Sequence, residues 1–549
     1  MPLTTTYKIA GRKTVGLGYW MVRVLEECEN VAADFGPDPV HDLRVSLRRC
    51  RSLADGLMAL DPDPEWKAMK KAGKRLFQRL GALRDIHVMA EWVEKLDPAR
   101  VGKEEAGVVS HFGPEPGPKL EAANAIPEPA VADVAESLRK ILKDREQEQK
   151  REAEAALEEF DRKQWKQWSK SLPARAARFR LGSALFKHLA LERWTAAREL
   201  HNRALRNRSQ TALHSLRIGI KRFRYIVENF LPAEHKAWSD DLKEIQDLLG
   251  EVHDLDVLWA KAVGSKVFPD AQSRELWHER IRAERGKRIA RYREKMVGPA
   301  SLWNVWRDGL PQGKQIAILA LRRMKLWASG LDPDFPHSER VANLALQIYD
   351  GLSAAGWQPA VDVASARCSL LAAALLHDVG KFKRVKGHHK SSLDLIRKHG
   401  TPLGWREADV QRAAVVARFH CRALPSRRHA LLRDLLPDEQ KATIQLAAIL
   451  RLANAMDAGH DGRIQKVRLE NGGGRYRDGH PARHEKHTNG FLRKRAGLVA
   501  NEALIIQAQG YSPAGCSAQT IAAERHLLEI VLRRPVIVKA MKPDAPGQV

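Results

Sequence analysis

Two groups of cations with identical spacing indicate binding of a repeating anion. The first group, the first comb, comprises His41, Arg44, Arg48 and Arg51. The second comb begins 173 residues later (214 − 41) and comprises His214, Arg217, Lys221 and Arg224. Both follow offsets 0, 3, 7 and 10, which on an α-helix place four side chains within an arc of roughly 80°. Arg binds phosphate oxygens through two hydrogen bonds and Lys adds a mobile charge, so each comb suits phosphate.

Further cations repeat in the same order after each comb. Two lysines and a glycine are spaced by seven, first as Lys67, Lys74 and Gly81, then as Lys236, Lys243 and Gly250. Each glycine opens a similar stretch, LGALRDIHV or LGEVHDLDV, which predicts a matching turn. A single comb is equally consistent with a solvated helix face, but a matched pair favours function. The first 300 residues therefore read as an internal duplication of one helical unit.

A histidine–aspartate cluster indicates metal chemistry in the second half of the chain. His377 and Asp378 end an apolar helix, with His337 40 residues before and His388 and His420 11 and 43 residues after His377. Imidazole with carboxylate suits Mn, Fe or Zn, and such ions polarise a phosphoryl oxygen and activate water. His389 is a neighbour of this set. Three further histidines read better as solvated loop residues: His480, His484 and His487.

Hydrophobic periodicity predicts a mainly α protein that positions these groups. A Pro- and Gly-rich insertion, 111–130, separates the two copies of the helical unit. Short strands are predicted at 466–470, 503–509 and 536–539, with a helix at 518–532. The expected domains are a duplicated helical bundle at 1–298, a linker helix at 299–331, an all-α domain at 332–460 and a small α/β extension at 461–549.

Composition restricts the partner and the compartment. The chain has 549 residues, with 93 Lys and Arg against 67 Asp and Glu, a formal net charge of +26. Such a surface attracts polyanions. The five cysteines are scattered, which is typical of free thiols in a reducing compartment. No secretory signal is evident and the apolar run at 370–376 is too short to span a bilayer, so we expect a cytoplasmic protein without a membrane partner.

The repeated H-x-L-R-x-x-x-[KR]-x-x-R helix and the LG-x-x-x-D stretch resemble the CHAD domain, the conserved-histidine α-helical domain, over roughly residues 1–298. The resemblance implies a pseudo-symmetric helical bundle that binds inorganic polyphosphate in a basic channel. His41 and His214 match the namesake histidines, either as contacts or as structural helix-start residues. The implied polyphosphate contacts are Arg44, Arg48, Arg51, Lys67, Lys74, Arg217, Lys221, Arg224, Lys236 and Lys243.

The order H…HD…HH…H, followed by LAAILRLANAMD, resembles the HD superfamily of metal-dependent phosphohydrolases. The sequence around each of these residues is most similar to the C-terminal part of exopolyphosphatases and guanosine pentaphosphate phosphatases, over about 332–549. The resemblance implies a divalent metal (Mn, Mg, Fe or Zn), with His377 and Asp378 as catalytic residues. The implied first metal ligands are His337, His377 and Asp378, and those for a second metal are His388 and His420.

Two departures from these families affect the expected function. The last HD ligand is normally an aspartate, and here Asn454 stands in its place, with Asp457 one turn further on as a substitute ligand. A neutral amide is a weaker ligand than a carboxylate, so weak or absent metal is the alternative to a loaded site. The sequence also lacks the actin-like catalytic domains of the exopolyphosphatases, so the resemblance does not imply their main activity for this chain.

These features predict a polyphosphate-binding protein with a C-terminal HD-type module, associated in the cytoplasm with polyphosphate granules. One alternative is an active metal-dependent phosphohydrolase acting on polyphosphate or on a phosphorylated nucleotide. Nucleic-acid binding through the combs is a weaker alternative, because base readout calls for aromatic or polar side chains beside the cations. The first comb helix, 40–60, contains no aromatic residue.

Overall fold

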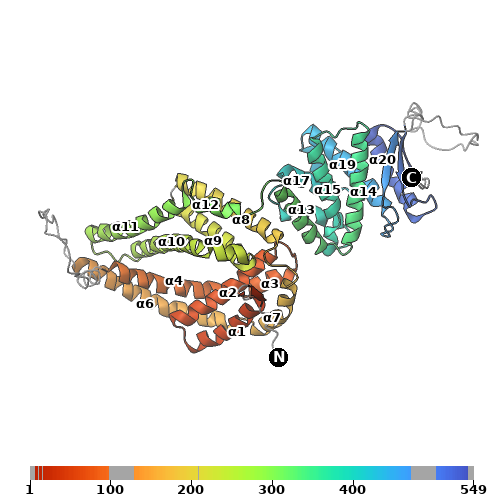
Figure 1. Cartoon of the computed structure of the whole chain (residues 1–549). Coiled ribbons are helices and arrows are strands. Elements are labelled where there is room, and N and C mark those ends of the chain that lie inside the picture. The colour runs from red at the N-terminus through yellow and green to blue at the C-terminus, as the bar shows by residue number, and fades with distance from the viewer. Residues whose placement is uncertain are drawn as a thin grey trace, which may run out of the picture. The chain divides into compact units, whose positions relative to one another are not determined.

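The computed structural model describes residues 7–9, 12–14, 16–97, 129–207, 209–471 and 503–541. These form two compact units, Met1–Leu319 and Ala320–Val549 (Figure 1). Both units are mainly helical, which confirms the predicted fold class. The predicted insertion at 111–130 lies outside the described residues apart from its last two positions. The three loop histidines of the C-terminal region lie outside them as well, and the predicted domain boundaries stay predictions.

The first unit opens with a small antiparallel hairpin, β1 (Tyr7–Ile9) and β2 (Arg12–Thr14). The helices that follow in its first half are α1 (Leu17–Ala33), α2 (Pro37–Leu57), α3 (Pro64–Ala72), α4 (Lys74–Leu96), α6 (Pro129–Glu158) and α7 (Arg162–Ala176). Those of its second half are α8 (Ala184–Asn207), α9 (Gln210–Phe230), α10 (Pro232–Gly264), α11 (Ala271–Met296) and α12 (Leu302–Asp308). The next helix, α13 (Lys314–Ser329), contains the boundary between the units.

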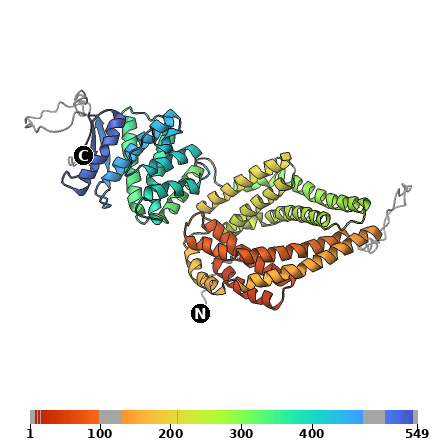
Figure 2. The same cartoon turned by 180° about the vertical axis from the view of Figure 1, so that it is seen from behind.

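The two halves of the first unit repeat one packing pattern. Helix α1 packs on α2 as α8 packs on α9, and α4 runs along α6 as α10 runs along α11 (Figures 1 and 2). The halves meet where α2 contacts α9 and where α4 contacts α10. The duplication expected from the sequence is therefore present as two matching sets of helices, with one comb helix, α2 or α9, in each.

The comb helices approach closely at one point. A Cβ atom on Gly56 of α2 would lie 2.1 Å from a ring carbon of Phe230, the last residue of α9. The Phe230 ring is buried and stacks on Phe186 of α8, with the ring centroids 4.2 Å apart. The ring therefore has little room to move, and only glycine at position 56 permits this contact. The two combs are held at a fixed separation as a result.

The turns predicted after Gly81 and Gly250 are wrong. Both stretches lie inside helices, α4 and α10. A helical glycine costs only about 1 kcal/mol relative to alanine, and burying the neighbouring leucines, Leu80 and Leu249 among them, outweighs that cost. A helix break occurs instead at Gly73, between α3 and α4, where the second copy continues as one helix.

The second unit combines a helical layer with a three-stranded sheet. Its helices are α14 (Phe335–Ala354), α15 (Val363–Leu376), the 3-10 turn η1 (Val379–Phe382), α16 (His388–His399), α17 (Glu407–Arg418), α18 (Ala430–Arg433), α19 (Pro437–Met456) and α20 (Cys516–Leu532). Its strands are β3 (Val467–Asn471), β4 (Leu504–Ala508) and β5 (Val536–Ala540), in the order β3-β4-β5. Strand β4 pairs antiparallel with β3 and parallel with β5.

One hydrophobic core holds the second unit together. Buried side chains of the strands, such as Leu504, Ile506 and Val536, belong to the same cluster as those of α14, α15, α17 and α19. The stretch Val363–Phe382 is apolar and long enough to cross a bilayer by length and composition, but 72% of its apolar window is buried inside the unit. Such burial is typical of the central helix of a globular core, and this helix carries His377 and Asp378 at its end.

Candidate functional site

The two combs come together in one cationic cluster within the first unit. Arg44 and Arg48 on α2 act electrostatically on Lys221 of α9, as does its own neighbour Arg217. Behind the cluster, Arg49 of α2 pairs with Glu228 of α9 at 2.5 Å, which ties the two helices together. The cluster therefore receives charge from both copies of the repeat, as the duplication predicts for a shared basic face.

Lys221 lies at the centre of this charge. Burial and the adjacent charges of Arg217 and Arg48 lower the pKa of Lys221 to about 7. Desolvation and like charge both disfavour the ammonium form, and here they act in the same direction. A polyanion in this place would supply the missing negative charge and return Lys221 to its protonated state.

Two aspartates from equivalent positions of the repeat face the cluster. Burial raises the pKa of Asp85 on α4, against the opposing charges of Arg44 and Arg217. Burial also raises the pKa of Asp254 on α10 to about 6, again against Arg217, with Asp85 adding to the increase. Both aspartates are the last residue of the repeated LG-x-x-x-D pattern, but only the structure shows that they lie among the cations of both halves.

Two arginines of the first comb, Arg51 and Arg44, make further contacts. Arg51 donates to the backbone oxygen of Lys70 at 2.7 Å and lies over the ring of Phe77, 5.1 Å from its centroid. Arg44 lies over the same ring at 5.7 Å. An aromatic side chain from α4 thus supports two guanidinium groups of the first comb, although the comb helix itself has none.

The remaining predicted polyphosphate contacts lie around the cluster. Arg224 is half-buried, 3.8 Å from Glu228. The lysines of the repeat are all exposed: Lys67, Lys74, Lys236 and Lys243. His41 and His214 each occupy the fifth residue of their helix. The ring of His214 lies against that of His253, with their Nδ1 atoms 3.3 Å apart. All of these assignments stay predictions.

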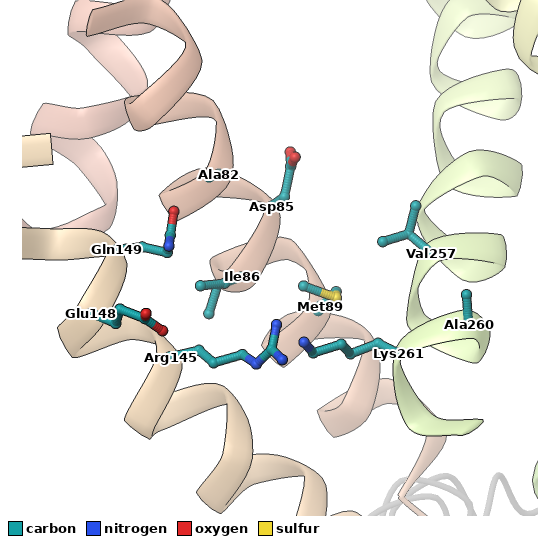
Figure 3. Close-up of a pocket in the computed structure, with 10 residues that line it drawn as sticks. All are labelled: Ala82, Asp85, Ile86, Met89, Arg145, Glu148, Gln149, Val257, Ala260 and Lys261. Atoms are coloured by element: carbon teal, nitrogen blue, oxygen red, sulfur yellow. The ribbon is translucent and has the colours of Figure 1, made fainter. Parts of the chain in front are cut away.

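A pocket of about 520 Å³ adjoins the cluster between α4, α6 and α10. Arg145 of α6 and Lys261 of α10 extend toward one another across it, and Asp85 lies on its wall (Figure 3). Ile86 and Met89 form part of its apolar lining. Arg145 and Lys261 were missed from the sequence because neither belongs to the repeated motif, and only the folded arrangement brings them together.

The histidine–aspartate cluster assembles inside the second unit. His337 lies in the first turn of α14, where the side chain of Asp334 caps the helix. His377 ends α15 and Asp378 begins η1. The ligand atoms of His337, His377 and Asp378 lie within 4.8 Å of one another, and all three residues are buried. Asp378, His388 and His420 form a second group with the same spacing.

Backbone carbonyls orient three of the imidazoles. The Nδ1 atoms of His377, His388 and His420 lie 2.7, 2.9 and 2.7 Å from carbonyl oxygens three residues earlier in the chain. A carbonyl can only accept, so each Nδ1 carries a hydrogen, and in the neutral ring Nε2 then offers its lone pair. This is the arrangement that metal-binding histidines adopt. Within the described residues, Nε2 of His377 is buried without a hydrogen-bond partner.

Asp378 is the carboxylate common to both groups. Its Oδ1 lies 3.1 Å from Nε2 of His388, and its Oδ2 lies 2.5 Å from Nζ of Lys381. Burial alone would raise its pKa, but His377 and His388 hold the pKa of Asp378 well below its usual range. The donor set of buried imidazoles around an ionised carboxylate fits a divalent metal such as Mn²⁺, Fe²⁺ or Zn²⁺.

Asn454 and Asp457 differ in where they lie. Oδ1 of Asn454 is 3.1 Å from Nε2 of His337, on the side that faces the cluster. Asp457 lies on the opposite side of the ring, 2.7 Å from Nδ1 of His337, and also accepts from Arg340 at 2.9 Å. Helix α19 ends at Met456, so Asp457 does not continue the face of Asn454. Asp457 therefore contacts the Nδ1 side of the His337 ring and Asn454 the Nε2 side, and the substitution of Asp457 for the ligand at 454 stays a prediction.

Two family models match the chain in separate regions. Residues 21–262 match the CHAD domain. The predicted CHAD resemblance is thereby confirmed for the first unit. Residues 326–499 match the Ppx/GppA phosphatase, domain III, which supports the exopolyphosphatase-like resemblance of the second unit.

Other comparisons add little beyond these two matches. No curated protein matches the chain. A crystal structure of the CHAD domain from the plant Ricinus communis shares 22% sequence identity, covers 53% of this chain and 88% of its own, and superposes with a TM-score of 0.32. The two family matches together suggest a polyphosphate-related, phosphatase-like protein.

Proposed function

We propose that the protein binds inorganic polyphosphate through the cationic cluster of its CHAD-matching unit. The observation that carries this proposal is that Lys221 of α9 feels the charges of Arg44 and Arg48 from the other copy as well as that of Arg217 from its own. Regularly spaced cations on both sides suit an anion with one negative charge per repeat unit. Binding of this kind is driven by counterion release and weakens steeply with salt.

A nucleic acid is the competing partner, and the surroundings of the cluster favour polyphosphate. Base recognition relies on open aromatic faces or polar groups at base edges. Phe77, the aromatic ring beside the first comb, already has Arg44 and Arg51 over its ring. We therefore expect short polyphosphate to displace bound RNA or DNA at concentrations where nucleic acid fails to displace polyphosphate. A fluorescence-anisotropy competition in both directions measures this, and displacement of polyphosphate by nucleic acid would reject the proposal.

Polyphosphate binding should strengthen as the pH falls from 8 to 5.5. At pH 8 Lys221, with its pKa of about 7, is largely neutral, and Asp254, with its pKa of about 6, is ionised. At pH 5.5 Lys221 gains a positive charge and Asp254 loses a negative one, which adds two units of favourable charge. At about 1 kcal/mol per unit the affinity should increase roughly 30-fold.

The control for this pH dependence is the double variant Lys221→Arg, Asp254→Asn. Its side chains hold the low-pH charges throughout the range, since arginine does not deprotonate and asparagine does not ionise. Calorimetric titration at constant ionic strength should give this variant a much flatter profile. An affinity of the native protein that stays constant or weakens toward pH 5.5 would contradict the charge assignments.

We further propose that the second unit is an HD-type phosphohydrolase dependent on a divalent metal. His337, His377 and Asp378 would hold one ion, with His388 and His420 available for a second. A bound divalent ion supplies Lewis-acid polarisation of a phosphoryl oxygen and a water of lowered pKa. The residues themselves keep Asp378 ionised, present Nε2 lone pairs from fixed rings and place the Lys381 ammonium beside Asp378.

The substrate proposed for this site is polyphosphate held by the same chain, with a phosphorylated nucleotide as the second candidate. The neutral amide at Asn454 favours the alternative, which is a module that binds metal weakly and only assists polyphosphate binding. Metal content of the purified protein beside that of His337→Ala separates these two cases, because an ion that is lost in this variant supports hydrolysis and the absence of such an ion supports a binding role.

A further inference from the structure

A third group of ligand atoms lies beside the proposed metal site. His388, His389 and Cys421 each offer one nitrogen or sulfur atom, and all three atoms lie within 4.8 Å of one another. Sγ of Cys421 lies 3.7 Å from Nδ1 of His389. This thiol group, as we name these three residues, shares only His388 with the group formed by Asp378, His388 and His420.

The backbone on both sides fixes the thiol group in place. His388 and His389 are the first two residues of α16, and their rings lie 5.7 Å apart at an angle of 80°. Cys421 follows His420 in the loop after α17, where Arg422 adopts a left-handed φ of 64°. The sharp bend lets His420 approach Asp378 and His388 while Cys421 approaches His389.

A buried arginine of α19 holds the loop that carries Cys421. Arg451 of α19 is 4% exposed and donates to the backbone oxygens of Phe419 at 2.8 Å and Arg422 at 3.3 Å. Its guanidinium is paired with Glu524 of α20 at 2.6 Å. Such a pair restricts the loop to one conformation, so the thiol of Cys421 is directed toward His389 by the fold. His389 itself is 8% exposed, and its ring is therefore directed into the unit.

We propose that His388, His389 and Cys421 form a thiolate-containing metal site that selects Zn²⁺ over Mg²⁺ and Mn²⁺. Two imidazoles and one thiolate are ligands that zinc prefers, and three protein ligands leave a fourth position open for water. The group contains no carboxylate, so Mg²⁺ and Mn²⁺, which favour oxygen, lack their preferred ligand.

The shared imidazole gives this site a consequence for its neighbour. Nε2 of His388 lies 3.1 Å from Oδ1 of Asp378 and 3.0 Å from Nε2 of His420. An ion at the thiol group competes with the neighbouring groups for this one ring. Zinc in excess should therefore weaken the binding of Mn²⁺ to the group formed by Asp378, His388 and His420. The thiol group itself requires only its own three residues and does not depend on hydrolysis by the second unit.

Cobalt substitution tests the site in the full-length protein. We expect Co²⁺ added to metal-free protein to produce a near-ultraviolet thiolate-to-cobalt charge-transfer band, which Zn²⁺ then removes. Cys421→Ser should abolish the band and weaken Zn²⁺ binding by more than about tenfold, since losing even an outer partner of a ligand costs that much. His389→Ala should weaken the band in the same way. The matched control is Cys368→Ser, an exposed cysteine of α15, which should leave the band unchanged.

Three outcomes overturn the proposal. They are a native protein that binds Co²⁺ without the band, a band that persists in Cys421→Ser, and a band lost equally in Cys368→Ser. Circular dichroism of each variant confirms that the helices remain. His337→Ala separates this site from the proposed hydrolase site, because it should leave the charge-transfer band intact while reducing Mn²⁺ binding. A native protein that releases no phosphate but shows the charge-transfer band would reject the proposed hydrolase function and support the zinc site.

Discussion

Reversing one charge in each comb, Arg48→Glu with Lys221→Glu, should abolish polyphosphate binding while preserving the helical bundle. At pH 6, where Lys221 with its pKa of about 7 is protonated, each reversal changes the local charge by two units, four in total across the cluster. At about 1 kcal/mol per unit charge near a phosphate, the loss is about 4 kcal/mol, or roughly 1000-fold in affinity. The two residues come from different copies of the repeat and act on one another across α2 and α9. Calorimetric titration with polyphosphate measures the change.

The control for this variant is Arg222→Glu. Arg222 is the exposed neighbour of Lys221 on α9 and is not part of the comb. The reversal there gives a net-charge change of the same sign at a different face of the helix, so its affinity should fall by far less. Far-ultraviolet circular dichroism should be the same for all three proteins. Binding that persists in the double variant at moderate salt would reject the shared cluster as the polyphosphate site.

Removing the central ligands, His377→Ala with Asp378→Ala, should eliminate metal-dependent phosphate release from polyphosphate. Metal-assisted stabilisation of a phosphoryl transition state is worth several kcal/mol, so the expected loss is at least about 1000-fold. Asp378 belongs to both ligand groups, and the variant therefore disables both. Release of phosphate with Mn²⁺ or Mg²⁺ is measured beside the metal content of each protein.

The control for the hydrolase test is His526→Ala. His526 lies on α20 of the same unit, with its side chain 49% exposed and outside the ligand groups. This variant should keep both its metal and its activity. Phosphate release that continues undiminished in the double variant would locate hydrolysis elsewhere or in a contaminant. Absence of release in the native protein, with binding intact, would favour the binding role and make Asn454 the residue to change to aspartate.

The sequence predicts the helical fold well because the duplication is visible in residue spacing. His41 and His214 both occur at the fifth position of their helices, and the strands of the second unit lie where short apolar runs predict them. The errors concern glycine. Gly81 and Gly250 were interpreted as turn residues, whereas burial of adjacent leucines keeps both stretches helical. Local propensity is a weak guide where tertiary packing is strong.

The candidate sites are only partly visible in the sequence. The order of histidines identifies the groups around Asp378, because ligands of one type repeat at recognisable intervals. Cys421 was interpreted only as a free thiol, since its approach to His389 depends on the bend at Arg422. The approach of Arg145 to Lys261 across the pocket likewise arises from packing of α6 against the bundle, which no local pattern encodes (Figure 3).

The contacts of Arg451 make the C-terminal segment necessary for the conformation of the loop that carries His420 and Cys421. Arg451 connects the backbone at Phe419 and Arg422 to Glu524, a residue of the last helix of the unit. A chain truncated after β3 would lose Glu524 and leave a buried guanidinium without its counter-charge, at a cost of about 3–5 kcal/mol. A protein truncated at the end of the helical layer would therefore release the loop that carries His420 and Cys421. Shortened versions of this protein should retain α20 if metal binding is to be studied.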